Sequence, residues 1–314
     1  MKAFIQNYWK TLLFFAIAGL VGGFFTGIYM LDSYPAEMKQ EILSQGITTT
    51  MMGLITAVQS AGYGLVLGAL GIFLGKKTGL WKDERHFEKK PLVLTAIVSL
   101  AGGLLLILPD VLFFGRYSQA IMDAYAVKPT IPYMLAAVLY GGVIEEVMLR
   151  LFWMSLVALV LRGIFDRKGE GVSTTILIAA NVISALLFAA GHLPSTFMMI
   201  GNSPMIIARC FIMNGGAGLM FGWLYRKYGF RYSMLAHAGC HVQHDHHDAV
   251  PAVLARFGVH LRREYAGGGV VVDHFVEKRD RLFHQKLGVG AGNKTVGGHL
   301  VQLLKERRFA ENIL

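Results

Sequence analysis

The stretch that decides the fold is IPYMLAAVLYGGVIEEVMLRLFWMSLVALVL, residues 131–161, which carries only three charged side chains. About 20 apolar residues are enough for a helix to cross the ~30 Å hydrocarbon core of a bilayer, so this segment is long enough to span one. Its charges are Glu145, Glu146 and Arg150. Each ionised group near a bilayer centre costs ~2.5–3.5 kcal/mol, and such groups face a protein interior or a wet cavity. The segment therefore predicts a functional site inside a membrane helix, or else a structural Glu146–Arg150 pair that joins helices.

The composition agrees with a membrane protein, because 54% of the residues are hydrophobic and only 16% are charged, whereas soluble domains are about a quarter charged. Prolines at 109 and 194 predict kinks. Further apolar segments of spanning length lie at residues 11–31, 47–75, 91–114, 172–200 and 204–225, and a seventh begins near Tyr232. They are too long for barrel strands, so helices must satisfy their backbone polar groups. We predict an all-α, polytopic transmembrane helical bundle with six full spans, a partial seventh and a polar C-terminal tail.

The loops between these segments alternate in positive charge. Six Lys or Arg side chains lie in residues 76–90, and further cations lie in the loops after residues 161 and 225. Since cytoplasmic loops are enriched in Lys and Arg, the pattern predicts a multi-pass cell-membrane protein with a cytoplasmic N-terminus. Orientation also explains the net charge of +10, which gives no reason to expect a nucleic-acid partner. The 76–90 loop could in addition contact anionic lipid head groups. The N-terminal segment lacks the features of a cleavable signal peptide, and Cys210 and Cys240 are expected to be buried thiols.

Three histidines also lie in apolar segments. His192 ends the sequence FAAGH, and His237 and His241 enclose HAGCH. A spacing of four residues places two side chains on one face of a helix, so His237 and His241 should be neighbours, as should Glu146 and Arg150. Carboxylate and imidazole groups together can activate water and protonate a leaving group, which peptide-bond hydrolysis requires. The same groups could instead hold a divalent metal. Weaker candidates in apolar helix are Asn181, Arg209 and Asn214.

Taken in order, these motifs resemble those of a known family. EExxxR occupies residues 145–150, FxxxH occupies residues 188–192, and His237-AGC-His241 stands where the family has HxxxN or HxxxD. This ordered set on successive membrane helices resembles the CPBP intramembrane proteases. That family includes the type II CAAX prenyl endopeptidases and bacteriocin-processing or bacteriocin-immunity proteins. The resemblance covers roughly residues 1–241.

The resemblance implies a role for each motif residue. Glu145 would be the general base that activates the hydrolytic water, and Glu146 with Arg150 would form the pair that orients it. His192 would complete the water site, and His237 would stabilise the oxyanion or protonate the leaving amine.

His241 departs from the family's Asn or Asp, although imidazole can also donate a hydrogen bond to an oxyanion. The family is described as metalloproteases, and a divalent metal such as zinc would bind Glu145, His192 and His237, but a metal-free mechanism is equally open. The implied substrate is a peptide bond of a membrane-associated peptide or protein, of prenylated or bacteriocin type, reached from the lipid bilayer. The alternative functions are a non-catalytic membrane protein, such as a degenerate immunity or partner protein, and an ion-coupled transporter.

The sequence changes character abruptly after His241. Five of the seven residues in 242–248 are His or Asp, and residues 242–314 hold seven of the eleven histidines and no segment of spanning length. We therefore divide the chain into a membrane-embedded protease-like domain, residues 1–241, and a polar, basic, His-rich tail, residues 242–314. Three origins for the tail are open: a soluble extension, a metal-binding segment using His244, His246 and His247, or a frameshift or fusion in the coding sequence, which the sudden change favours.

Overall fold

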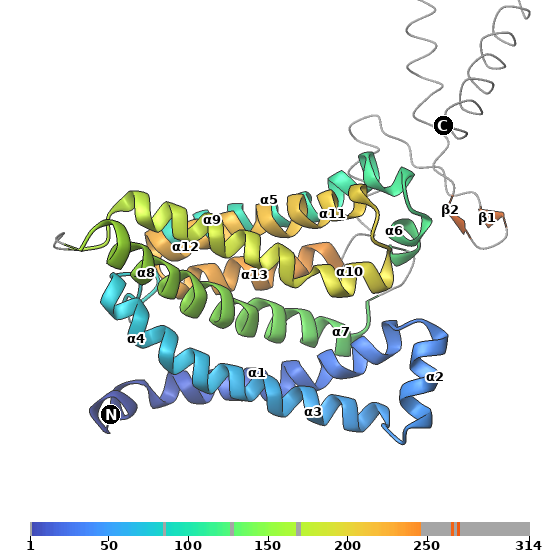
Figure 1. Ribbon diagram of the computed structural model, residues 1–314, viewed down its shortest axis with the longest axis horizontal. Helices are drawn as coiled ribbons and strands as arrows, with labels where there is room; N and C mark the ends of the chain where they lie inside the picture. The colour runs from blue at the N-terminus through green and yellow to red at the C-terminus, as the bar shows by residue number, and fades with distance from the viewer. Residues whose placement is uncertain are drawn as a thin grey trace, which may run out of the picture. The chain divides into compact units, whose positions relative to one another are not determined.

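A computed structural model describes residues 2–83, 86–125, 129–167, 171–245, 265–266 and 269–270. The chain divides into two compact units, Met1–Ala249 and Val250–Leu314. In the second unit the described residues form only a short antiparallel pair of strands, β1 (Tyr265–Ala266) and β2 (Gly269–Val270). The predictions made for the tail, including its His246 and His247, lie outside the described residues. Every regular element among the described residues of the first unit is a helix (Figure 1).

Six helical segments of the first unit are long and apolar enough to cross a membrane, which confirms the predicted fold class. They run Ala3–Ser33, Thr49–Thr78, Lys89–Leu112, Ile131–Phe165, Thr174–Met199 and Pro204–Tyr228. The first corresponds to α1 (Lys2–Ser33), and the second comprises α3 (Thr49–Gly62), the π-helical η1 (Tyr63–Leu67) and α4 (Gly68–Thr78). The third is α5 (Lys89–Leu112), in which Pro109 sits inside the helix without ending it. The predicted boundaries agree with these within a few residues, except that the first span extends further toward the N-terminus.

The remaining three spans combine several elements each. The fourth comprises α7 (Ile131–Leu135), the π-helical η3 (Ala136–Glu145) and η4 (Val147–Met154), and α8 (Ser155–Phe165). The fifth joins α9 (Thr174–Gly191) to α10 (Leu193–Met199). The sixth comprises α11 (Pro204–Cys210), the π-helical η5 (Phe211–Gly215) and α12 (Gly216–Tyr228). Shorter elements are α2 (Ala36–Ser44), the 3₁₀-helical η2 (Phe114–Arg116) and α6 (Gln119–Ala124), and α13 (Phe230–Asp245) completes the unit.

Polar side chains mark where four of the spans begin. A Ser or Thr precedes each of these helices, and its hydroxyl oxygen accepts a hydrogen bond from a backbone N–H three residues later. The four capping residues are Thr48, Thr130, Ser173 and Ser203. Such caps satisfy donors that a helix leaves free at its start and contribute about 0.5–2 kcal/mol each. They fix the helix boundaries that bring the site residues to their depth in the bundle.

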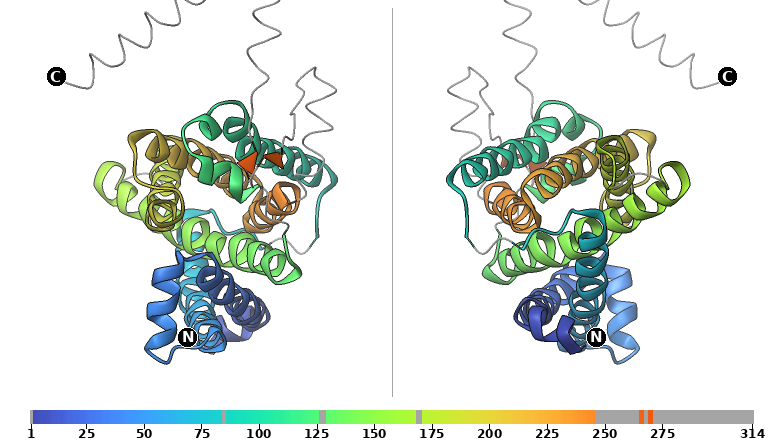
Figure 2. Two further views of the ribbon diagram at one scale, coloured as in Figure 1. Left: turned by 90° about the vertical axis from the view of Figure 1, so that its right-hand side faces the viewer. Right: turned by 90° about the vertical axis from the view of Figure 1, so that its left-hand side faces the viewer.

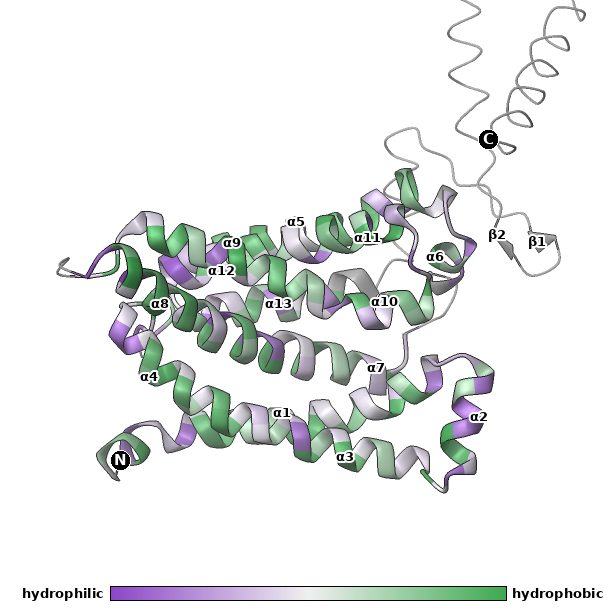
Figure 3. Cartoon of the chain, viewed as in Figure 1, coloured by the Kyte–Doolittle hydropathy of each residue, from purple (hydrophilic) through white to green (hydrophobic). Residues whose placement is uncertain are grey.

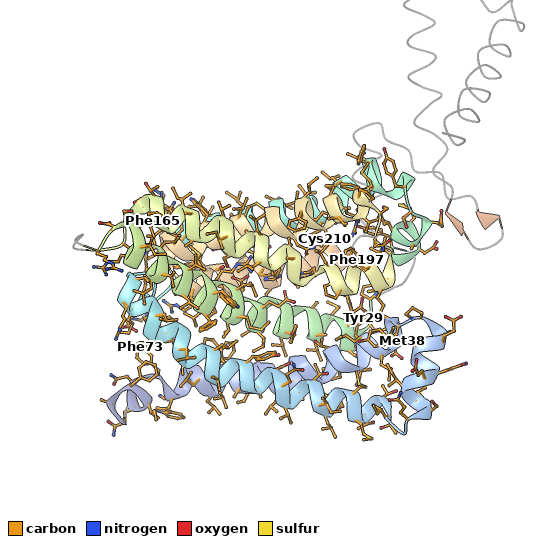
Figure 4. The ribbon with its side chains drawn as sticks, viewed as in Figure 1. Tyr29, Met38, Phe73, Phe165, Phe197 and Cys210 are labelled. Carbon is orange, nitrogen blue, oxygen red and sulfur yellow. The ribbon has the colours of Figure 1, made fainter. Side chains whose placement is uncertain are left out.

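The sides of the helices are apolar and exposed, which is how a membrane protein meets lipid. Side chains such as Val58 (69% exposed) and Ile164 (62% exposed) stand among many exposed large hydrophobic residues. Figure 3 shows hydrophobic residues along the lengths of the helices. In Figure 4, Phe73 and Phe165 lie toward one end of the bundle, while Tyr29 and Phe197 lie toward the other. An apolar surface of this extent is unstable in water, so the structure is that of a multi-pass membrane protein.

The helices form layers, which the end-on views of Figure 2 separate. The first layer pairs α1 with α3 and α4, the second is the long helix from α7 to α8, and the third holds α5, α9, α12 and α13. Small residues allow the closest approach in the first layer. A Cβ atom added at Gly23 or Gly27 of α1 would lie 2.5 Å or 2.4 Å from atoms of α3. Glycines four residues apart permit such backbone contact between membrane helices.

The seventh helix, α13, is longer than the ten residues that the sequence predicted, because it begins at Phe230 and continues to Asp245. It is not one of the six spans. Gly229 separates it from α12 with a φ of +105°, a conformation that favours glycine. The helix lies between α5 and η3, and Ser233, His237 and Cys240 on it are buried. It therefore belongs to the core of the bundle.

A second buried ion pair lies away from Glu145 and Glu146. Asp110 of α5 is fully buried and accepts two hydrogen bonds from Arg209 of α11, at 2.6 Å from Nε and 2.5 Å from Nη2. The hydroxyl of Tyr125 lies 3.0 Å from Asp110 Oδ2 and 2.9 Å from the carbonyl oxygen of Leu106. Burial, and then the Asp110 charge, raise the pKa of Tyr125. Arg209, a weak site candidate in the sequence, is thereby assigned to a contact that joins two spans.

Candidate intramembrane active site

The helix that carries the two glutamates is wound unusually. Residues Ala136–Glu145 and Val147–Met154, on either side of Glu146, form π-helix. π-Helical turns are rare and occur frequently at functional sites. Two glycines on this helix make room for α13: a Cβ atom at Gly141 would lie 2.6 Å from His241 Nε2, and one at Gly142 would lie 2.6 Å from Ala238 Cβ. The glycine pair thus allows the histidine helix to approach the glutamate helix.

Glu146 and Arg150 form a buried ion pair, as their spacing predicted. Arg150 Nη1 lies 3.1 Å from Glu146 Oε1, and the two side chains are 1% and 0% exposed. The guanidinium carbon lies 4.5 Å from the ring centre of Phe188 and 5.5 Å from that of Phe221. Neither Nη atom makes a hydrogen bond of good geometry within the described residues. Arg150 is therefore held by the charge of Glu146 and by two aromatic faces rather than by aligned hydrogen bonds.

Glu146 also contacts α13. Nδ1 of His237 donates a hydrogen bond of 2.9 Å to Glu146 Oε1, and the Ser233 hydroxyl contacts Glu146 Oε2. Ser233 Oγ lies in addition 2.9 Å from the carbonyl oxygen of Phe221, so its single proton serves one of these two acceptors at a time. Because an ionised carboxylate only accepts, Nδ1 of His237 carries a proton, and Nε2 of the neutral ring is left as an acceptor.

The Nε2 side of His237 faces the other two candidate residues. His241 Nε2 lies 3.2 Å from His237 Nε2, and since the latter accepts, His241 donates. Oε2 of Glu145 lies 3.9 Å from the same nitrogen. Glu145 is 18% exposed, in contrast to the fully buried Glu146. The adjacent carboxylates thus have different surroundings: Glu146 is enclosed on the Nδ1 side of His237, and Glu145 is partly exposed on the Nε2 side.

Aromatic rings fix the plane of the His237 imidazole. The ring stacks on Phe221 with centres 4.5 Å apart and an interplanar angle of 21°. The His237 ring also stacks with the His241 ring, with centres 4.9 Å apart, and lies edge to face with the Phe188 ring, with centres 5.8 Å apart. A ring held by a carboxylate and by stacked neighbours presents Nε2 in a fixed direction, which proton transfer requires.

His192 lies at the end of α9, beside these residues, and among the described residues it forms no hydrogen bond or ion pair with either glutamate. Its Nδ1 donates a 2.9 Å hydrogen bond to the carbonyl oxygen of Phe188, and its ring meets the Phe188 ring at 4.6 Å. This bond leaves Nε2 as an acceptor in the neutral ring. Phe188 therefore links His192 to His237 and Arg150, which explains the presence of a phenylalanine in that motif.

Across the described ranges, no group of three or more His, Cys, Asp or Glu side chains is arranged to hold a metal ion. Glu145 and His237 lie close together, but His192 reaches them only through Phe188. Ligation of a metal by Glu145, His192 and His237 stays a prediction.

Two further residues of the site, Ser233 and Phe221, were not among the predicted site residues. Ser233 precedes His237 by four residues, a spacing that places both on one face of α13, so its position was readable from the sequence. Phe221 gave no such signal, because one phenylalanine among many in apolar helices is indistinguishable until the helices pack.

The fold and the site define a class: a helical membrane protein with a carboxylate–histidine centre enclosed between its spans. Residues 127–242 match the family described as type II CAAX prenyl endopeptidase Rce1-like, and this match supports the predicted resemblance to the CAAX proteases. No curated protein and no solved structure matches the chain. The matched segment contains all six predicted site residues, so it supports a CAAX-type intramembrane protease.

Proposed function

We propose that this protein is an intramembrane endopeptidase that hydrolyses a peptide bond with a water molecule activated by Glu145. The observation that carries the proposal is that the two adjacent carboxylates, Glu145 and Glu146, have different surroundings. Glu146 is enclosed and bonds His237 Nδ1 at 2.9 Å, whereas Glu145 is partly exposed and lies 3.9 Å from His237 Nε2. Neighbouring titratable groups in different environments can take different roles in one reaction.

In the proposed first step, the Glu145 carboxylate takes a proton from water while the water oxygen bonds to the carbonyl carbon of the substrate. The carbonyl π electrons move to oxygen and form an oxyanion. His192 Nε2, an acceptor when Nδ1 donates to Phe188, would hold the second water proton. His241 Nε2–H, which donates to His237 in the resting structure, would donate to the oxyanion.

In the second step, the oxyanion collapses, the C–N bond breaks, and the leaving nitrogen takes the proton first removed from water. That proton would pass from Glu145 to His237 Nε2 and then to the amine. The imidazolium formed in transit would be stabilised by the Glu146 carboxylate at Nδ1. Arg150 is a positioning residue here, since it pairs with Glu146 Oε1, the same oxygen that accepts from His237 Nδ1. The polypeptide's own groups thus account for both proton transfers.

The substrate we propose is a membrane-associated peptide or protein, of prenylated or bacteriocin type. The family description supports a prenylated substrate. The charge of the loops supports a cell-membrane location with the N-terminus in the cytoplasm, because residues 76–90 hold six cations. A prenyl chain would lie in the bilayer and deliver the adjoining peptide bond to a site between the spans.

The experiment is Glu145→Gln in proteoliposomes with a quenched fluorescent, farnesylated peptide. Gln keeps the shape of Glu but cannot take a proton, so we expect cleavage to fall by about 10²–10⁴-fold. Glu41→Gln, on the exposed part of α2, is the matched control and should cleave like wild type. Activity of Glu145→Gln near the wild-type rate would refute the assigned base. A wild-type protein that is folded but cleaves no prenylated or bacteriocin-type peptide would favour the non-catalytic alternative.

A further inference from the structure

A cavity opens at the end of the bundle where α1 begins and where α4 and α12 end. It encloses about 730 Å³. Its wall combines residues of α1, of the segment after α4, and of the turn between α12 and α13. The site residues Glu145, His192 and His237 do not line it. It is therefore a separate feature.

The wall of this cavity is strongly cationic. Four cations, Lys10, Lys76, Lys82 and Arg231, line it together with one carboxylate, Asp83, which gives a net charge of +3. That carboxylate is already engaged, because it accepts a 2.6 Å hydrogen bond from Trp81 Nε1 and 3.1 Å bonds from the Tyr8 hydroxyl.

The cations are only partly neutralised. Lys76 Nζ is 3.8 Å from Asp83 and donates at 2.8 Å to the Tyr8 oxygen. Within the part of the chain that the structure describes, neither Lys10 nor Arg231 forms an ion pair. An anion of more than one negative oxygen is the ligand that such a wall favours.

The floor and one side of the cavity are apolar, which selects an amphiphile over a free anion. Phe15 and Phe230 are buried at the floor, with their rings edge to face at 5.7 Å. Phe14, which also lines the cavity, is 44% exposed, and Ile17 and Val21 continue its face of α1 with 51% and 38% exposed.

Lys10 stands four residues before Phe14, so one face of α1 carries a cation followed by an apolar stripe. A phosphate placed among the cations would have its acyl chains lying along this stripe. This is the end of the bundle that we propose faces the cytoplasm, where anionic lipids concentrate.

We propose that this cavity binds the phosphate head group of an anionic phospholipid. Its charge partners would be Lys10 and Arg231, which form no ion pair among the described residues, and the Phe14–Ile17–Val21 face of α1 would hold an acyl chain. The wall combines residues near the start of α1 with residues of the turn between α12 and α13, which lie far apart in the sequence. A bound lipid would therefore tie the start of α1 to the turn before α13, the helix that carries His237 and His241.

The test measures binding to the full chain in a neutral maltoside detergent, by the change in tryptophan fluorescence and in melting temperature. Trp81 lines the cavity and serves as the internal reporter. The probes are dihexanoyl phosphatidylglycerol, dihexanoyl phosphatidylcholine and inorganic phosphate. We expect saturable binding of the phosphatidylglycerol, at least about tenfold tighter than that of either other probe. Each Lys or Arg near an anionic membrane surface contributes about fivefold, so Lys10→Gln should weaken binding by about that factor.

Lys77→Gln is the matched control, because Lys77 is the neighbouring exposed lysine of α4 and does not line the cavity. It should bind the lipid like wild type. Equal binding of the two lipids, or equal loss in Lys10→Gln and Lys77→Gln, would overturn the proposal. Equal binding of inorganic phosphate and phosphatidylglycerol would assign the cavity to a free anion and overturn the lipid assignment. The wild-type comparison of probes decides the matter even if a variant folds poorly.

Discussion

Replacement of Arg150 by Ala tests the buried ion pair most directly. Arg150 is 1% exposed and Glu146 is 0% exposed, so removal of the guanidinium leaves a carboxylate with no access to solvent. Breaking a buried pair by removing one partner costs about 3–5 kcal/mol. For folded units of 150–250 residues, each kcal/mol changes the melting temperature by about 2–4 °C. We therefore expect Arg150→Ala to melt about 6–20 °C below wild type in detergent.

A double variant separates the charge from the packing. Glu146→Gln with Arg150→Met removes both buried charges and keeps similar volumes, which is often neutral or stabilising. It should recover most of the lost melting temperature. Proteolytic activity should be low, because Glu146→Gln removes the carboxylate that holds the imidazole of His237. A single Arg150→Ala variant that melts within about 2 °C of wild type would refute the buried-pair reasoning and indicate a well-hydrated site.

Further predictions concern the approach of α13 to the glutamate helix, the buried Ser233 hydroxyl and the orientation of the chain in the membrane. Gly142→Ala should push α13 away and lower proteolytic activity at least about tenfold, because a Cβ atom there would lie 2.6 Å from an atom of α13. The control is Gly163→Ala, where a Cβ atom would have nothing within 4 Å. This variant should gain about 0.5–1 kcal/mol in unfolding free energy. Ser233→Ala removes a donor to the buried carboxylate and should cost about 1–3 kcal/mol by chemical unfolding, whereas wild-type stability would argue that the hydroxyl serves the backbone carbonyl instead. For topology, a cysteine at Lys77 should resist an impermeant thiol reagent outside intact cells and one at Gln45 should react, and the reverse pattern would invert the proposed orientation.

Much of the fold was readable from the sequence because the bilayer imposes a simple rule. A backbone in hydrocarbon must satisfy its own polar groups, so each apolar run of about 20 residues becomes a helix. The six runs predicted from composition are the six spans of the structure. Local spacing was equally informative: residues four apart share a helix face, which correctly paired Glu146 with Arg150 and His237 with His241.

The length of the seventh helix was predicted less well. A polar run begins at residue 242, and hydropathy alone ended the helix at His241, whereas α13 continues to Asp245. Hydropathy reports whether a segment can face lipid, but α13 packs among other helices, and a buried helix does not need an apolar surface on every side. The predicted division of the chain at residue 241 stays a prediction.

What the sequence by itself determined is the six spans, their approximate boundaries and the identity of the charged groups inside them, because these depend on transfer free energies and on spacing along one helix. What only the tertiary structure decided is which groups meet across helices. The carboxylate that bonds His237 Nδ1 is Glu146, the one near Nε2 is Glu145, and His192 forms no hydrogen bond or ion pair with either. Adjacent glutamates are chemically identical in a sequence. They become different only when packing encloses one and leaves the other partly open, since solvent access and partners come from neighbouring helices.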